Sequence, residues 1–479
     1  MSSGKSFPAT QTRYIPSSYN SVFDKGAKGY GYNFLYRSMV EIDPAVYGQV
    51  REALSDPSGE LASRLPLDCL TALVDADFLI PSTRSELALI RRRYYRQLFG
   101  LNAVTLAILP TLSCDLTCPY CYVRKQPGIM KAKVADAIAE WIRRAFRPKR
   151  HLHVVWSGGE PLLAKRTIQR LTQSLADICR KWKAGYTAAL MTNGYHLDRE
   201  VIDQIEYWGL QSVQVTLDGD REHHDALRRP RRGGGSFDRI AENIERFCAA
   251  SLQCHLVVRV NLTDGNYASA FELLEQFGPG VRGKARLMFA WVWPSAASGF
   301  LDLAPQGRKT DSFRRLDALY QAAIDCGWLT CNPGPPYVDG YCEVDSSHYF
   351  SIDPVGNLSL CNHACAAEAV GSVFQPGTGL NDDQVDFYDS WRSANPFGDL
   401  ECRACRLLPV CWGGCRKARV SGGRPCIHER DAIELLAEVT VRDHLRSLAR
   451  TDAHGGSSPP QADTPGGVQV LKAKYPRTL

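Results

Sequence analysis

Three cysteines in one short segment constrain this chain more than any other feature of its sequence. Cys114, Cys118 and Cys121 have the spacing C-x3-C-x2-C, with Tyr120 directly before the last of them. A 4Fe-4S cluster is normally tied by four cysteines, so three thiolates leave one iron open, as a catalytic metal site requires. A zinc site would need a fourth Cys or His at short spacing, which does not follow here. We therefore expect a cluster that binds and reduces a small molecule.

Composition places the chain among globular proteins of the cytoplasm. It has 479 residues, 44% of them hydrophobic, and 17 cysteines, which in a long cytosolic chain point to metal or catalysis rather than to disulfides. Residues 1–16 are polar, and no run of about eighteen apolar residues occurs. We expect a soluble cytoplasmic protein without a membrane partner. The formal charge of +6 is only weak evidence for nucleic acid, and we expect none.

The middle of the chain alternates short apolar runs with amphipathic helical stretches, which is typical of a parallel sheet covered by helices. The predicted strands are 103–110, 151–156, 186–191, 212–217, 255–262 and 286–293. Six βα units are too few for a closed eight-strand barrel, so we predict a partial, TIM-like (βα)6 barrel of the α/β class. The active site of such a barrel is expected at the carboxyl ends of its strands.

Polar and glycine-rich motifs follow these strands and, with the cysteines, resemble the signature of the radical S-adenosylmethionine (radical SAM) enzymes. The resemblance implies cofactor contacts from Gly158, Gly159, Glu160, Pro161, Thr192, Asn193, Gly194, Asp218, Arg259 and Asn261. Glycines let the backbone approach a ligand closely. Away from the cysteines, the Thr192-Asn-Gly194 segment is also consistent with an ordinary turn, and the later residues with satisfied polar groups at strand ends.

A second cysteine array near the C-terminus resembles the SPASM domain, which carries two auxiliary clusters in peptide-modifying radical SAM enzymes. The resemblance implies that Cys342, Cys361 and Cys415 bind the first auxiliary cluster, and Cys402, Cys405, Cys411 and Cys426 the second. The first set lacks one ligand, for which Cys331 and Cys365 are candidates. An open auxiliary iron that grips the substrate is the other possibility.

Four regions follow from these patterns. We predict a small, winged-helix-like, peptide-recognition-like α/β module in residues 1–100 and the radical SAM core in residues 101–330. The SPASM domain would occupy residues 331–432, and a C-terminal helix and disordered tail residues 433–479. The tail prediction rests on the Gly, Ser and Pro content after Thr451.

The resemblance implies S-adenosylmethionine and three 4Fe-4S clusters as cofactors, and an electron donor such as flavodoxin or ferredoxin. A 5'-deoxyadenosyl radical would abstract hydrogen from a ribosomally made precursor peptide, and the peptide would gain a carbon-carbon, thioether or ether crosslink. One alternative is the anaerobic sulfatase-maturating type, which makes formylglycine. That family has an Asp base where this chain has Asn362, and an amide cannot take the proton. A protein of another class, an electron carrier that does not cleave the cofactor, is the second alternative.

Overall fold

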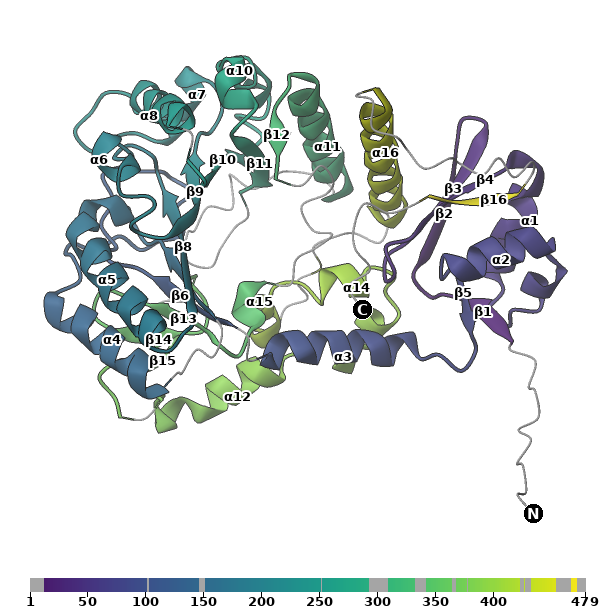
Figure 1. Ribbon diagram of the computed structural model, residues 1–479, viewed down its shortest axis with the longest axis horizontal. Helices are drawn as coiled ribbons and strands as arrows, with labels where there is room; N and C mark the ends of the chain where they lie inside the picture. The colour runs from purple at the N-terminus through teal and green to yellow at the C-terminus, as the bar shows by residue number, and fades with distance from the viewer. Residues whose placement is uncertain are drawn as a thin grey trace.

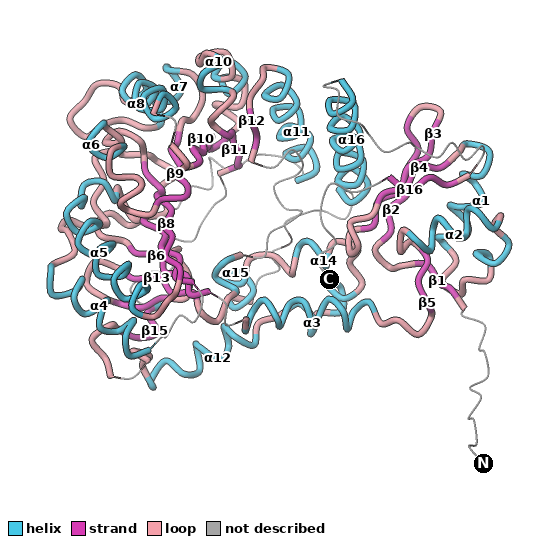
Figure 2. The backbone as a smooth tube through the Cα atoms, in the orientation of Figure 1, coloured by secondary structure: helices cyan, strands magenta, loops and turns pink. Residues whose placement is uncertain are grey.

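A curved sheet of ten strands organises the computed structural model, with helices along its outer side (Figures 1 and 2). Its strand order is β12-β11-β10-β9-β8-β7-β6-β13-β14-β15. The structure describes residues 13–100, 103–145, 151–250, 252–292, 309–331, 342–363, 368–376, 378–422, 426, 432–453 and 467–471.

Eight neighbouring strands of this sheet run parallel, and seven of them form the predicted partial barrel. They are β6 (Ala103–Ile108), β7 (His151–Trp156), β8 (Gly185–Thr192), β9 (Leu210–Thr216), β10 (His255–Leu262), β11 (Arg286–Trp291) and the short β12 (Leu329–Thr330). The sequence predicted the first six, and β12 adds a seventh parallel strand at one edge.

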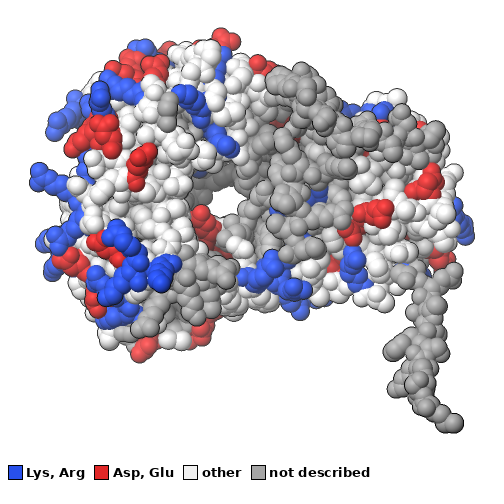
Figure 3. All heavy atoms as spheres, viewed as in Figure 1, with Lys and Arg blue, Asp and Glu red and all other residues white. Residues whose placement is uncertain are grey.

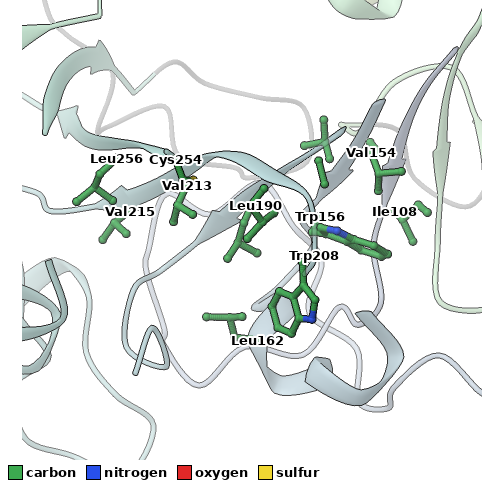
Figure 4. Close-up of a cluster of buried hydrophobic side chains, with 14 of the residues drawn as sticks. Ile108, Val154, Trp156, Leu162, Leu190, Trp208, Val213, Val215, Cys254 and Leu256 are labelled. Carbon is green, nitrogen blue, oxygen red and sulfur yellow. The ribbon is translucent and has the colours of Figure 1, made fainter. Parts of the chain in front are cut away.

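Buried apolar side chains fill the space between this sheet and its helices. Figure 4 shows part of that core, where Ile108, Val154 and Leu190 lie on neighbouring strands, near Trp156 and Trp208. The covering helices carry apolar stripes that the 3.6-residue period had indicated. They include α4 (Ala132–Ala145), α5 (Lys165–Lys181), α7 (Arg221–Leu227), α8 (Phe237–Ala249) and α11 (Lys309–Asp325). Because these strands are parallel, their carboxyl ends, with the predicted site residues, lie along the same end of the barrel.

The C-terminal cysteine region is joined to the barrel through the sheet itself. Strand β13 (Tyr349–Ile352) pairs in parallel with β6. Strands β14 (Asn357–Ser359) and β15 (Ala369–Ser372) continue the sheet, each antiparallel to the strand before it. The predicted SPASM region, residues 331–432, therefore begins as a continuation of the barrel sheet. Short helices follow: α12 (Val385–Ser393), α13 (Leu400–Arg403), α14 (Leu408–Cys411) and α15 (Arg416–Val420).

The N-terminal module is built on a second sheet with the order β16-β4-β3-β2. Its elements are β1 (Tyr14–Pro16), β2 (Asn20–Lys25), β3 (Lys28–Asn33), β4 (Met39–Ile42), α1 (Pro44–Ser55), α2 (Leu67–Asp75) and β5 (Leu79–Pro81). The module thus combines strands and helices. The predicted disordered tail is wrong at Val468–Leu471, because these residues form β16, the edge strand of this sheet.

Two long helices connect the module to the rest of the molecule (Figure 1). Helix α3 (Glu86–Phe99) packs Tyr94 against Phe397 in the C-terminal region. Helix α16 (Ala432–Ala453) lies between α11 and the module, where Arg442 pairs with Asp317 over 2.6 Å. Figure 3 shows basic and acidic side chains interspersed over the face in view. No helix in the described ranges is both long and apolar enough to cross a bilayer.

Candidate active site

The three cysteines of the N-terminal array lie in the loop between β6 and α4, at the carboxyl edge of the barrel. The segment after α7 holds this loop: Thr117 N donates to Arg229 O over 2.9 Å, and Arg231 Nε donates to Cys114 O over 2.9 Å. Cys114, Cys118 and Cys121 are all partly exposed, whereas Cys179 and Cys248 are buried under helices. Thiols that remain accessible at a strand edge can reach a cluster.

Burial and neighbouring charges shift the pKa values of two thiols in this loop. The pKa of Cys114 is raised to about 12, chiefly by burial and next by nearby Glu160, while the Leu116 amide and Lys125 lower it. Burial also raises the pKa of Cys118, while Arg228 lowers it. Iron would overcome this preference for the thiol form, because a coordinating thiol is deprotonated by the metal. The loop therefore depends on its metal to carry thiolates.

The Ser157-Gly-Gly-Glu-Pro161 turn packs directly on the cysteine loop. Gly158 has φ +124°, and a Cβ there would lie 2.4 Å from Thr111 O; a Cβ on Gly159 would lie 2.1 Å from Ser113 O. Gly159 N donates to Thr111 O over 3.0 Å, and Glu160 N to Ser113 O over 2.8 Å. Gly158 and Gly159 thus let the backbone of the cysteine loop approach the turn closely. Their contact with the cofactor stays a prediction.

The Glu160 carboxylate joins this turn to the end of β8. It accepts hydrogen bonds from Leu162 N (2.9 Å), Thr192 Oγ1 (2.8 Å) and Asn193 N (2.7 Å) and is fully buried. Burial raises its pKa to about 7, although the three donors favour the charged form. Pro161 is buried and begins the 3-10 turn after it. Glu160 thus fixes the relative position of two predicted cofactor segments.

Asn193 links the end of β8 to the cysteine loop. Its Nδ2 donates to Asp115 Oδ1 over 2.8 Å and lies 3.8 Å from Cys114 Sγ. His196 Nε2 lies 2.9 Å from Asp115 Oδ2. Gly194 follows with φ +85°, and its amide donates to Thr192 Oγ1 over 3.0 Å. Thr192, Asn193 and Gly194 therefore lie beside the cysteines, as the resemblance implied.

Tyr120 is the centre of a polar network that the sequence did not single out. Its hydroxyl contacts Asp218 Oδ2, accepts from Arg228 Nη1 over 2.8 Å and lies 3.4 Å from Asn261 Nδ2. Burial raises the pKa of Asp218, although Arg228, 3.6 Å away, favours its charged form. The position of Tyr120 between two cysteines was the signal available.

The predicted residues of β10 complete this network. Asn261 N donates to Asp218 Oδ1 over 2.9 Å, and Arg259 Nε donates to Asn261 Oδ1 over 2.8 Å. Asp218, Arg259 and Asn261 thus gather beside the cysteine loop. Each of these residues also has a hydrogen-bond partner within the chain. The structure is therefore compatible both with a purely structural role and with a cofactor contact.

The C-terminal cysteines fall into two groups in space. The pKa of Cys342 is raised to about 12, chiefly by burial, and Cys361 and Cys415 are among the smaller causes that raise it. Burial likewise raises the pKa of Cys402, with Asp399, Cys411 and Cys426 also acting on it. These neighbours are compatible with the two ligand sets that the resemblance implies, which stay a prediction, and Cys405 lies two residues beyond helix α13.

The missing ligand of the first group stays open. Cys331 directly follows β12, where its amide donates to Leu287 O over 3.0 Å. Burial raises its pKa and Arg286 lowers it, and none of the auxiliary cysteines acts on it. Cys365, the other candidate, lies outside the described residues. The assignment of all auxiliary ligands stays a prediction.

The donor set suits an iron-sulfur cluster better than a single ion. Among the described residues, no three His, Cys, Asp or Glu side chains are placed to hold one metal ion. Thiolates around a cubane each bind a different iron, so they stand further apart than the ligands of one ion. Partly exposed thiols on one loop, beside buried polar groups, fit that arrangement.

Comparison with known proteins identifies the barrel. Residues 108–274 match the model of the radical SAM superfamily, and this range contains the cysteine loop, Glu160, Asn193 and Asp218. These residues form a radical SAM domain. The match covers 167 of the 479 residues, and the curated relatives described next are named as enzymes.

Relatives at low identity extend over more of the chain. The cysteine-type anaerobic sulfatase-maturating enzyme of Clostridium novyi is 20% identical over 349 residues, 66% of this chain and 89% of that protein. The PqqA peptide cyclase of Ruegeria pomeroyi is 25% identical over 323 residues, 64% of this chain and 80% of that one. The solved structure of native anSMEcpe with bound AdoMet and Cp18Cys peptide has a TM-score of 0.51 and 17% identity, covering 74% of this chain and 99% of that chain. This structural likeness shows the shared fold.

Proposed function

We propose that this radical SAM enzyme is a peptide maturase that acts on a ribosomally made precursor and forms a carbon-carbon, thioether or ether crosslink. The radical chemistry is supported by the hydrogen bonds that join the Cys114 loop, Glu160 and Asn193 at the carboxyl edge of the barrel. The peptide part rests on the N-terminal sheet, whose edge at β4 accepts a further strand, and on a relative that is named a peptide cyclase.

The chain's own residues would position the reactants. Cys114, Cys118 and Cys121 would hold the first 4Fe-4S cluster, which with S-adenosylmethionine supplies the radical that takes a hydrogen atom from the substrate. The Glu160 carboxylate holds the glycine turn against the end of β8, and its backbone amide bonds to Ser113 O of the cysteine loop. These bonds would form the cofactor's binding surface before the cofactor arrives. The network of Tyr120 similarly fixes Asp218 and Arg228.

Two auxiliary clusters would be held by the C-terminal cysteines. Cys342, Cys361 and Cys415 are close enough to influence one another's charge, as are Cys402, Cys411 and Cys426. Clusters near the substrate could accept the electron that remains when a crosslink closes. A small electron-transfer protein such as flavodoxin or ferredoxin would supply the reducing electron.

Formylglycine formation is the second candidate because a relative with 89% coverage is named a sulfatase-maturating enzyme. Asn362 Oδ1 lies 3.9 Å from Cys361 Sγ, so an amide stands beside the cysteine. An amide cannot act as the base that takes a proton. This chemistry favours the crosslinking maturase.

Anaerobic co-expression with the peptide encoded by a neighbouring short open reading frame tests the proposal. We expect the peptide to lose one pair of hydrogens, localised by fragmentation to two residues. The Cys114→Ala, Cys118→Ala, Cys121→Ala variant should leave the peptide unchanged. Deoxyadenosine formation without any change in the peptide would contradict the proposed substrate while leaving the radical chemistry intact.

A further inference from the structure

The loop after helix α7 carries a run of exposed arginines. Residues 228–235 read Arg-Arg-Pro-Arg-Arg-Gly-Gly-Gly. Arg228 is buried, whereas Arg229, Arg231 and Arg232 are exposed. The buried arginine belongs to the polar network beside the cysteine loop. The other three place their charges at the surface, in the connection that follows β9.

This arginine loop is bonded to the backbone of the cysteine loop. Leu116 and Pro230 form an antiparallel bridge. The Arg231 amide donates to Asp115 O over 2.8 Å, and the Arg231 Nε donates to Cys114 O over 2.9 Å. These bonds lay the arginine loop along the segment that holds the first of the three predicted cluster ligands. A molecule that binds the arginines therefore lies against the cysteine loop.

A second basic segment returns to the same stretch of the cysteine loop. Lys125 Nζ donates to Leu116 O, and the exposed Arg124 directly precedes this lysine. Ser113 Oγ donates to Gln126 O over 2.9 Å. The two basic segments thus meet at the backbone between Ser113 and Leu116. We call their exposed arginines the basic surface: Arg124, Arg229, Arg231 and Arg232.

The charge of the basic surface is not neutralised within the described part of the chain. Residues 110–131 and 228–235 hold seven Lys or Arg and a single acidic residue, Asp115. The Asp115 carboxylate is already bonded to Asn193 and His196. No described carboxylate forms an ion pair with any of the four arginines. Positive charge of this kind attracts an acidic partner and steers its approach.

The position of the basic surface selects the kind of acidic partner. Radical SAM chemistry begins when one electron reaches the cluster on the cysteine loop. Electron transfer slows steeply with distance, so the donor has to dock close to that loop. Nucleic acid is also anionic, but it has no electron to deliver there. A small acidic redox protein therefore fits both the charge and the place.

We propose that the basic surface docks an acidic flavodoxin, which delivers the single electron that the cluster needs. The reduced flavin of the donor loses one electron and the 4Fe-4S cluster gains it, so no further reactant is required. The interface would be small, as is usual for transient redox pairs, and held mainly by charge. The use of the electron rests on the proposed function, whereas the docking itself does not.

Charge reversal on the arginine loop tests the docking. Arg229→Glu with Arg232→Glu changes two exposed side chains and leaves the backbone bonds of the loop in place. Arg51→Glu with Arg64→Glu is the matched control, because both residues are exposed in the N-terminal module, away from the barrel (Figure 1), and the net charge changes equally. With fluorescently labelled, oxidised flavodoxin at about 50 mM salt, we expect Kd to rise at least about tenfold for the first variant and less than about twofold for the control. Salt at about 0.5 M should weaken binding to the unchanged chain, since it screens the charges.

Two outcomes of this titration would overturn the proposal: equal affinity in both variants, or no binding to the unchanged chain. A third is a labelled single strand of about twenty nucleotides that binds more tightly than flavodoxin and loses affinity in the Arg229→Glu, Arg232→Glu chain, because the surface would then be a nucleic-acid site. Hydrogen exchange needs no variant. Saturating flavodoxin should slow exchange in residues 114–117 and 228–235, and unchanged exchange there would contradict the docking.

Two reductants separate docking from the radical chemistry. With reduced flavodoxin below saturation, deoxyadenosine formation should be at least about tenfold slower in the Arg229→Glu, Arg232→Glu chain than in the control variant. With dithionite, which needs no protein interface, the two should be equal. An equal loss with both reductants would show damage to the site and overturn the proposal. Absence of deoxyadenosine from every chain with dithionite would contradict the proposed function, while the binding measurements would still decide the docking.

Discussion

The ring of Tyr122 stacks on that of His363, with centroids 3.7 Å apart and planes inclined by 13°. Tyr122 directly follows Cys121, and His363 is two residues beyond Cys361. The stack therefore joins the loop of the first cysteine array to the second array, which lies far away in the sequence. Together with the β6–β13 pairing, it fixes the distance between the two predicted cluster sites.

This contact predicts a measurable coupling between the two residues. Tyr122→Leu and His363→Leu, combined in a double-mutant cycle, should show a coupling free energy of about 0.5–1.5 kcal/mol in urea unfolding, as aromatic pairs do. A matched cycle of Tyr122→Leu with His151→Leu, on the distant β7 strand, should be additive. Additivity in the first cycle would mean that the stack does not stabilise the junction.

The cysteine loop predicts a loss of iron together with a loss of chemistry. Cys114→Ala, Cys118→Ala, Cys121→Ala should lower the iron content of anaerobically purified protein by about four atoms per chain and abolish deoxyadenosine formation. The control is Cys248→Ala, which removes a buried thiol of α8. This variant should keep its iron content and still form deoxyadenosine. An electron carrier that never cleaves the cofactor would form no deoxyadenosine in any of these proteins.

Glu160 predicts a large effect from a nearly isosteric change. Glu160→Gln leaves one oxygen for three donors and turns an amide group toward Thr192 or Asn193. We expect a loss of about 1–3 kcal/mol in unfolding free energy, because a buried donor loses its partner. Glu200→Gln is the control, since the Glu200 side chain is 77% exposed and its removal should change stability by less than about 0.5 kcal/mol.

The same residue predicts a pH dependence. The pKa of Glu160 is raised to about 7 in the folded chain, so the folded state holds this proton more tightly than the unfolded state. Its stabilising contribution is complete below the unfolded pKa of about 4.3 and is lost as the pH rises through about 7. The stability advantage of the unchanged chain over Glu160→Gln should therefore grow as the pH falls from 8 to 5. An advantage that is constant over this range would contradict the raised pKa.

We predict that the Tyr120 hydroxyl stabilises the buried ion pair of Asp218 and Arg228. Tyr120→Phe removes the group that contacts Asp218, Arg228 and Asn261, and should cost about 1–3 kcal/mol. Tyr207→Phe removes a hydroxyl that bonds Gln173 on the surface, and should change stability by less than about 0.5 kcal/mol. Chemical denaturation measures the unfolding free energy of both variants. Equal losses in Tyr120→Phe and Tyr207→Phe would argue against a stabilising network around Tyr120.

Local patterns were sufficient for the barrel and for the residues at its edge. Apolar runs such as His151–Trp156 predict buried parallel strands because both faces are covered, and the predicted residues from Glu160 to Asn261 do lie around the cysteine loop. The resemblance to the SPASM domain implies the two groups around Cys342 and Cys402, and this assignment stays a prediction. These features depend on side-chain chemistry and on spacing along the chain, which a sequence displays directly.

Contacts between distant segments could not be predicted this way. The tail after Thr451 has the composition of a disordered segment, yet Val468–Leu471 form a strand because β4 supplies the hydrogen-bond partners and α2 the apolar wall. The glycines Gly158 and Gly159 suggested a ligand, but the close neighbours are Thr111 and Ser113 of the cysteine loop. The sequence by itself determined which chemistry the chain carries and at which strand ends. Only the tertiary structure decided which distant segments meet, because a partner's surface, rather than local propensity, provides the free energy for those contacts.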